Sequence, residues 1–142
     1  MYFRMLRGIG GVLIVVSFVL PLSTCQIAAN PDVTHAAREK VTNYGYSYVD
    51  LNDMGSWLFP LAFFWPIPVL FFRRRINTII QIRVISMVEV LLCIYSGYLM
   101  WVVGELGDPQ YGFFVAIAGI GLYIFTVVVE MVKPSYYDGF TP

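Results

Sequence analysis

Long runs of apolar residues separated by short polar segments dominate the pattern of the chain. Four of these runs approach or reach the length of a membrane span, namely residues 8–25, 56–72, 78–103 and 112–132. A helix of about 20 apolar residues crosses the ~30 Å hydrocarbon core of a bilayer. The pattern therefore predicts an all-α membrane protein with four transmembrane helices. The second helix is the shortest and matches the hydrocarbon core least well.

The polar segment at residues 26–55 is the longest connection between two apolar runs. Within it, Asn30 can cap a short helix that has Pro31 at its first position, and an extended segment follows. Too little chain remains outside the runs for a separate soluble domain with its own core. We therefore expect residues 1–142 to form a single four-span membrane domain with an ordered outer loop.

Three tyrosines alternate with small residues in the extended segment of this outer loop, at Tyr44, Tyr46 and Tyr48. A period of two places all three rings on one face of an extended chain. Such a row beside a membrane is either an interfacial anchor or a docking surface, because a lone strand has edges that can pair with a partner strand. We favour the anchor and keep the tyrosines as a candidate docking surface.

The composition agrees with a membrane protein. Hydrophobic residues make up 58% of the chain and charged residues 13%, and the mean hydropathy is +0.72. These values lie well outside the range of soluble globular proteins. The formal net charge is zero, and the sequence has no basic tail or basic face. We therefore expect no nucleic-acid partner.

Basic residues are distributed unevenly between the two sides of the predicted topology. Seven of the nine fall in the N-terminal segment, the connection between the second and third runs, and the C-terminal tail. Because positively charged flanks are retained in the cytoplasm, both termini should be cytoplasmic, and we expect a bacterial inner membrane. The connection supplies the residues expected to contact lipid head groups at the inner interface, which are Arg73, Arg74, Arg75 and Arg83.

The outer end of the first run, with the sequence VLPLSTCQ, permits two interpretations. A lipoprotein signal peptidase could cut before Cys25, since Leu22 stands three residues earlier, but Thr24 is not the small residue that such a site requires. We favour a retained signal anchor that Pro21 kinks or ends near the outer surface. Cys93 would then differ from Cys25 in height by roughly 15 Å, which is too far for a disulfide.

The chain offers few groups for catalysis or cofactor binding. Its single histidine, His35, falls in the outer loop, and its two cysteines are far apart in the sequence. These residues form no metal-ligand spacing and cannot supply two histidines to a haem. No Ser/His/Asp or Cys/His set can be assembled at one depth. We predict no enzyme activity, no metal and no bound cofactor.

Two prolines, Pro66 and Pro68, fall in the inner half of the second run. Each removes a backbone donor and pushes on the preceding turn. This helix should therefore bend or loosen and leave carbonyl oxygens that need partners. A broken helix can line an ion or substrate site, as in transporters. We favour a packed kink, because proline is common in membrane helices.

Glu89 is the residue that most suggests a functional site, because an acid within an apolar helix is costly unless it is paired. Its helix face carries other polar or small residues at i, i+3 and i+4 spacing, and Glu130 lies at a similar height in the fourth run. The group could be a proton or cation site or a salt-bridge network with the nearby arginines, and we favour the network. The candidate polar site comprises Ser86, Glu89, Cys93, Ser96 and Glu130.

These features favour an accessory or assembly subunit of a larger membrane complex, because 17% of the residues are aromatic and the interior is scarcely polar. The expected partners are membrane lipids and other integral membrane subunits, and a homo-oligomer is a further option. The alternative is a small oligomeric transporter or channel that uses Glu89 as its coupling acid. A third option is a subunit of a redox or quinone complex whose cofactors lie on another chain.

In size and number of spans the chain resembles the small multidrug-resistance transporters. Those proteins carry their essential acid in the first helix, whereas the first run of this chain contains no acid. The resemblance therefore covers topology only, and no residue role is carried over from it.

Overall fold

The computed structural model is mostly helical and also contains a three-stranded sheet. The residues that it describes are 2–27, 39–50, 52–73, 75–76 and 78–132. The predicted loop helix after Asn30, together with His35 and Arg74, lies outside the described residues. In chain order the elements are α1 (Tyr2–Ser17), β1 (Pro21–Ile27), β2 (Glu39–Tyr44), η1 (Gly45–Tyr48), η2 (Met54–Trp57), α2 (Leu58–Phe64), α3 (Pro66–Arg73), α4 (Ile79–Leu106), β3 (Asp108–Pro109) and α5 (Tyr111–Val132).

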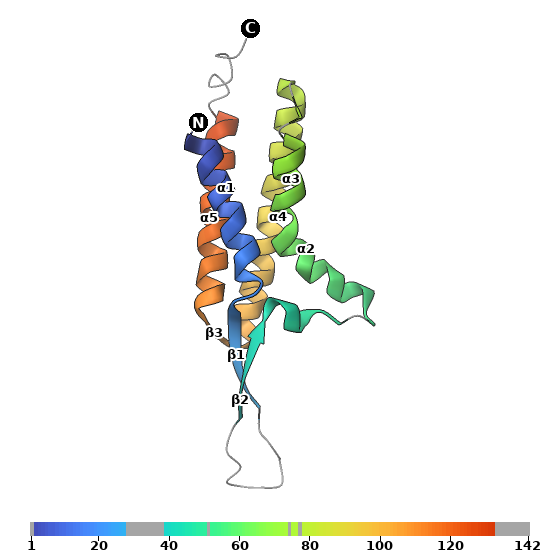
Figure 1. Ribbon diagram of the computed structural model, residues 1–142, viewed down its shortest axis with the longest axis vertical. Helices are drawn as coiled ribbons and strands as arrows, with labels where there is room; N and C mark the ends of the chain where they lie inside the picture. The colour runs from blue at the N-terminus through green and yellow to red at the C-terminus, as the bar shows by residue number, and fades with distance from the viewer. Residues whose placement is uncertain (1, 28–38, 51, 74, 77, 133–142) are drawn as a thin grey trace.

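The helices α1, α3, α4 and α5 run roughly along one axis, with the sheet at one end of the bundle, and α2 turns away from that axis (Figure 1). Figure 1 shows α1 beside α5 and α3 beside α4, and the start of α1 lies at the end opposite the sheet. The packing of α1 against α5 is the most extensive between any two helices, and α4 also packs on α5. The buried core follows these contacts and includes Ile14, Phe63, Met100, Tyr123 and Val127.

The backbones of α1 and α5 approach each other closely at two glycines. A Cβ added to Gly10 would lie 3.0 Å from the carbonyl oxygen of Gly119, and a Cβ added to Gly119 would lie 3.0 Å from the carbonyl oxygen of Gly10. Small residues permit such approaches between helices packed in a membrane. This crossing brings α1 close enough to α5 for their polar side chains to meet.

Two helices are long and apolar enough to cross a membrane, α4 over Ile80–Leu106 and α5 over Tyr111–Val132. They correspond to the predicted helices at 78–103 and 112–132. Only 28% and 33% of their most apolar windows are buried inside the protein. A core helix of a soluble protein would bury most of its apolar surface, so this exposure suggests association with a membrane.

The first predicted helix, residues 8–25, is wrong in its second half. The helix α1 ends at Ser17, and the chain continues as a strand. The hydroxyl of Ser17 donates to the carbonyl of Ile14 at 2.6 Å, and the next three residues donate to carbonyls three positions back. These bonds tighten the last turn, and Pro21 has no N–H with which to continue the helix. The 16 residues of α1 span about 24 Å.

The sheet corrects the expectation of an all-α fold. Its strand order is β2-β1-β3, and both pairs are antiparallel. The central strand, β1, contains the end of the first apolar run, and its short partner β3 places Thr24 opposite Asp108. The backbone N–H of Gln110 also donates to the carbonyl of Leu22 at 2.9 Å. The sheet therefore ties the first apolar run to the connection between α4 and α5.

The three tyrosines do not lie on one face of an extended segment, contrary to the prediction. Strand β2 ends at Tyr44, and the chain turns into the 3-10 helix η1. The rings of Tyr44 and Tyr46 stack at 5.1 Å, whereas Tyr48 stacks on Phe59 of α2 at 4.7 Å. The strand is also not alone, because β2 pairs with β1.

The second predicted helix, residues 56–72, is divided into α2 and α3. The division lies before Pro66, whose missing N–H would otherwise bond to the carbonyl of Ala62. The hydroxyl of Ser96 in α4 takes over this role and donates to the Ala62 carbonyl at 2.7 Å. The indole N–H of Trp65 donates in turn to the Ser96 oxygen at 3.0 Å. The freed carbonyl thus has a partner from a neighbouring helix.

Candidate functional site

Four charged side chains meet inside the bundle at the end opposite the sheet, and we call them the charge cluster. They are Arg7 of α1, Arg73 at the end of α3, Glu89 of α4 and Glu130 near the end of α5. The side chain of Glu89 is 0% exposed, Arg7 is also buried, and the other two are largely buried. Two positive and two negative charges, each from a different helix, therefore share one site.

The two arginines bridge the two carboxylates. Oε2 of Glu130 lies 2.5 Å from Nη2 of Arg7 and 2.5 Å from Nη2 of Arg73. Oε2 of Glu89 lies 2.7 Å from Nη1 of Arg73 and 3.9 Å from Nη2 of Arg7. Arg73 thus holds the two acids with two different nitrogens, which its planar guanidinium permits and a lysine would not.

Neutral side chains complete the surroundings of Glu89. The hydroxyl of Tyr123 donates to Oε1 of Glu89 at 3.1 Å. The guanidinium of Arg7 lies over the ring of the same tyrosine, with its carbon 5.7 Å from the ring centre. Nη1 of Arg73 also lies 3.4 Å from the hydroxyl of Ser86. Both carboxylate oxygens of Glu89 are therefore engaged by side chains of other helices.

Arg7 is held less completely than Arg73. Its Nη2 forms the short ion pair with Glu130, but the angles at this contact are not those of a hydrogen bond. Its Nε has no hydrogen-bond partner among the described residues. A buried donor without a partner costs about 1–3 kcal/mol. A small change in the position of α1, or a polar group that reached Nε, would relieve this cost.

The arrangement is suited to holding helices together. Moving a charge out of water costs several kcal/mol, and a partner repays this cost only at close range and in good geometry. With all four groups ionised, the two positive and two negative charges of the cluster balance. Removing any one of the four helices would leave an unbalanced buried charge among the other three, so each helix is stabilised there only in the presence of the others. The buried position of Glu89 keeps its carboxylate away from the surface.

The structure brings three of the five predicted polar residues into the charge cluster or its edge, namely Glu89, Glu130 and Ser86. Cys93 is buried one turn beyond Glu89 and is a free thiol. Ser96 lies farther along α4, at the joint between α2 and α3, and belongs to the hydrogen bonds described above. The predicted site therefore divides into a charged part and a neutral part.

The arginines predicted to contact lipid head groups also divide. Arg73 turns inward and joins the charge cluster. Arg75 and Arg83 are exposed, and the guanidinium of Arg75 lies 5.2 Å from the centre of the Phe71 ring. The two exposed residues remain available for head groups, whereas the buried part of Arg73 is directed at carboxylates.

Arg7 is the member of the charge cluster that the sequence pattern does not single out. An arginine before an apolar run is typical of an orientation signal. This pattern by itself therefore does not indicate that Arg7 also turns into the bundle. Its spacing nevertheless carried information, because Gly11 and Ile14 follow at i+4 and i+7 and pack inward on the same helix face.

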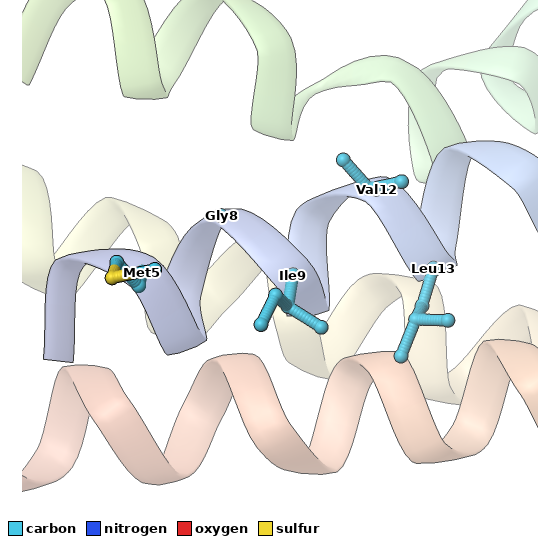
Figure 2. A pocket seen from close by; sticks show the side chains of 5 residues that line it. All are labelled: Met5, Gly8, Ile9, Val12 and Leu13. Atoms are coloured by element: carbon cyan, nitrogen blue, oxygen red, sulfur yellow. The ribbon is translucent and has the colours of Figure 1, made fainter. Parts of the chain in front are cut away.

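An apolar groove of about 410 Å³ runs along the surface of α1 (Figure 2). It carries no charged or hydrogen-bonding side chain and is therefore suited to an apolar occupant. Gly8 leaves a gap between the larger residues of the groove. Its lining consists of Met5, Gly8, Ile9, Val12 and Leu13.

The described residues contain no group of three or more His, Cys, Asp or Glu side chains that could hold a metal. Cys25 and Cys93 are both free, which confirms the prediction that they are not bridged. The thiol of Cys25 donates instead to the carbonyl of Leu106 at 3.3 Å and accepts from the amide of Asn43 at 3.4 Å.

No family model, curated protein or solved structure matches this chain. Its function must therefore be inferred from the geometry of the charge cluster and from the surfaces of the helices.

Proposed function

We propose that this chain is a four-span integral membrane protein without enzyme activity, acting as an accessory or assembly subunit of a larger membrane complex. The spans are α1, the broken pair α2 and α3, α4 and α5. Both termini lie in the cytoplasm of a bacterial cell, and the sheet lies on the opposite side. The described basic residues at the end opposite the sheet favour this orientation.

The observation that carries the proposal is the closed state of the charge cluster. Glu89 is fully buried and bonded through both oxygens, to Arg73 and Tyr123. A coupling acid in a transporter must be reached by its ion from one side of the membrane and then from the other. A carboxylate fixed in this way supports a structural role, in which the charges define how four helices fit together.

The outer surfaces of the helices supply the second argument. Large apolar side chains are exposed along α4 and α5, including Leu91, Ile94, Trp101, Phe114 and Phe125. Lipid tails and apolar helices of other subunits both suit such surfaces. The apolar groove of α1 adds a surface of the same kind, and its glycine would allow close approach of a partner helix.

The experiment is gentle extraction of the native protein, followed by mass determination of the intact particle and identification of every protein in it. We expect unrelated integral membrane proteins in fixed stoichiometry with this chain. A particle that contains only copies of this chain would contradict the subunit proposal.

A second candidate is a small oligomeric transporter or channel with Glu89 as its coupling acid. Two observations favour it: the second span is broken at Pro66, and the buried Nε of Arg7 has no hydrogen-bond partner in the described part of the chain. A broken helix and an incompletely satisfied charge are features of sites that rearrange. In this function, the charge cluster would open when a proton or cation reached Glu89.

Proton flux into liposomes that contain the purified chain tests this second candidate. Glu89→Gln should abolish the flux if Glu89 is the coupling acid. The control is the double variant Arg73→Met/Glu89→Gln, which also lacks the acid but leaves Arg7 paired with Glu130. Flux that persists in the double variant would remove Glu89 from the mechanism, and absence of flux in the unmodified protein would remove the candidate.

A further inference from the structure

The exposed side chains of α4 change character twice along the helix. Arg83 is exposed near the start of the helix, and Glu105 is exposed near its end. Every exposed side chain between these two charges is apolar or aromatic, from Val84 to Trp101. We call this face, residues 84–101, the apolar band of α4. A charged residue therefore lies beyond each of its borders.

Aromatic rings that carry a polar group occupy one border of the apolar band. Tyr98 and Trp101 are both more than half exposed, and their ring centres lie 6.3 Å apart. Among the side chains that the structure describes, none of the exposed tyrosines and tryptophans lies near the charge cluster; they are Tyr46, Trp57, Tyr98, Trp101 and Tyr111. Rings of this kind are enriched where lipid meets water. The border near the sheet thus has the side chains of a lipid boundary.

The length of the apolar band matches a lipid bilayer. Trp101 follows Arg83 by 18 residues of continuous helix, which is about 27 Å. On α5, Tyr111 and Glu130 are 19 residues apart, or about 28 Å, and every exposed side chain between them is apolar. The hydrocarbon core of a bilayer is ~30 Å thick. A protein partner would not require this length on two helices, so lipid is the occupant that the spacing favours.

We propose that the apolar band of α4 contacts lipid along its whole length, with Tyr98 and Trp101 in the outer head-group layer and Arg83 in the inner one. This inference rests on the proposed membrane location and deepens it, because it assigns this face to lipid and not to another subunit. Glu89 follows Arg83 by six residues, which places it about 9 Å inside the inner head groups. The charge cluster then lies within the hydrocarbon core, away from lipid phosphates.

The depth of tryptophans placed along the apolar band tests this proposal. In a background with Trp57→Phe and Trp101→Phe, one exposed tryptophan is introduced by Val84→Trp or Leu91→Trp, or is restored at Trp101. Trp65 is kept throughout because it is only 2% exposed and gives a constant background. Each full-length variant is reconstituted into phosphatidylcholine liposomes that carry bromine either near the glycerol or near the end of the acyl chain.

We expect the deep bromine label to quench the Leu91→Trp variant more strongly than the shallow label does, because this position lies near the middle of the apolar band. For Val84→Trp and for Trp101 itself, the shallow label should be the stronger quencher. Equal depths at all three positions, or a stronger effect of the deep label at Trp101, would overturn the proposal. Ile94→Trp replaces Leu91→Trp if the latter does not fold, since Ile94 is also exposed and close to the middle of the band.

Phe125 of α5 separates this inference from the proposed function. Its side chain is exposed on a second helix, so Phe125→Trp in the same background reports insertion independently of α4. Quenching of this variant with none along α4 would mean that a protein surface covers the apolar band, which overturns this proposal and leaves the membrane location intact. Absence of quenching at every position, including Phe125→Trp, would overturn the membrane location itself.

Discussion

The two ends of the helical bundle are held together by different chemistry. At the end opposite the sheet, two arginines and two glutamates from four helices form the charge cluster, and the stability of this end depends on the balance of their charges. At the sheet end, the contacts are neutral hydrogen bonds, backbone pairs and stacked rings. The charged end should therefore fail as a unit when one member is removed, whereas the neutral end should lose stability in small steps.

Removal of a single charge should have the largest effect. Glu89→Gln leaves the two arginines with only the carboxylate of Glu130, and an uncompensated buried charge costs about 3–5 kcal/mol. We expect a loss of that size in the free energy of unfolding, measured by denaturant titration in mixed micelles. The amide of glutamine can still accept from Tyr123, so the loss reports on the charge.

The double variant Arg73→Met/Glu89→Gln sharpens this result. It removes one charge of each sign and leaves Arg7 and Glu130 at 2.5 Å. Replacing a buried ion pair by groups of similar volume is often close to neutral, so the double variant should recover most of the stability. A double variant that is less stable than Glu89→Gln alone would show that the balance of buried charges does not determine the stability of the end that holds the charge cluster.

The crossing of α1 and α5 between the two ends should come next. Gly119→Val adds atoms where even a Cβ would lie 3.0 Å from the Gly10 carbonyl, and overpacking costs about 1–3 kcal/mol. The matched control is Gly121→Val, since a Cβ there has nothing within 4 Å. We expect lower thermal stability in detergent for the first variant only. Equal melting temperatures would mean that the helices can separate at this point without loss.

A neutral contact with two buried partners should cost somewhat less than the loss of a charge. Ser96→Ala leaves the Ala62 carbonyl and the Trp65 indole N–H without their hydrogen-bond partner in α4, and an unsatisfied buried group costs about 1–3 kcal/mol. Ser86→Ala is the control on the same helix, because its contact with Arg73 is long, at 3.4 Å. Denaturant titration should show the larger loss for Ser96→Ala, and the reverse order would contradict the assigned role of Ser96.

The sequence predicts the long helices and the buried acids better than it predicts the structure of the sheet end. The runs that became α4 and α5 are longer than any ordinary strand, so their hydrophobicity is sufficient to identify them. Glu89 and Glu130 stand out because acids are costly in apolar helices. Pro66 likewise indicates a break and a carbonyl in need of a partner, which Ser96 supplies.

The strand β1 and the role of Arg7 depend on contacts that local sequence does not encode. A short apolar stretch has no periodicity that separates a helix from a strand. The choice at Pro21 to Ile27 is made by pairing with β2 and with the connection after α4. The inward direction of Arg7 likewise depends on Glu130, which is far along the chain. Both features require the fold before they can be recognised.

The smallest effect is expected where the sheet meets α2, and it tests the stepwise character of that end. The oxygens of Tyr48 and Ser23 lie 2.9 Å apart in a hydrogen bond, and the Tyr48 ring also stacks on Phe59. Tyr48→Phe keeps the stacking and removes the bond, so the free energy of unfolding should fall by about 0.5–1.5 kcal/mol. Tyr46→Phe, at an exposed ring, is the control and should change little. A loss for Tyr48→Phe as large as that for Glu89→Gln would mean that the neutral end also fails as a unit, and the contrast between the two ends would disappear.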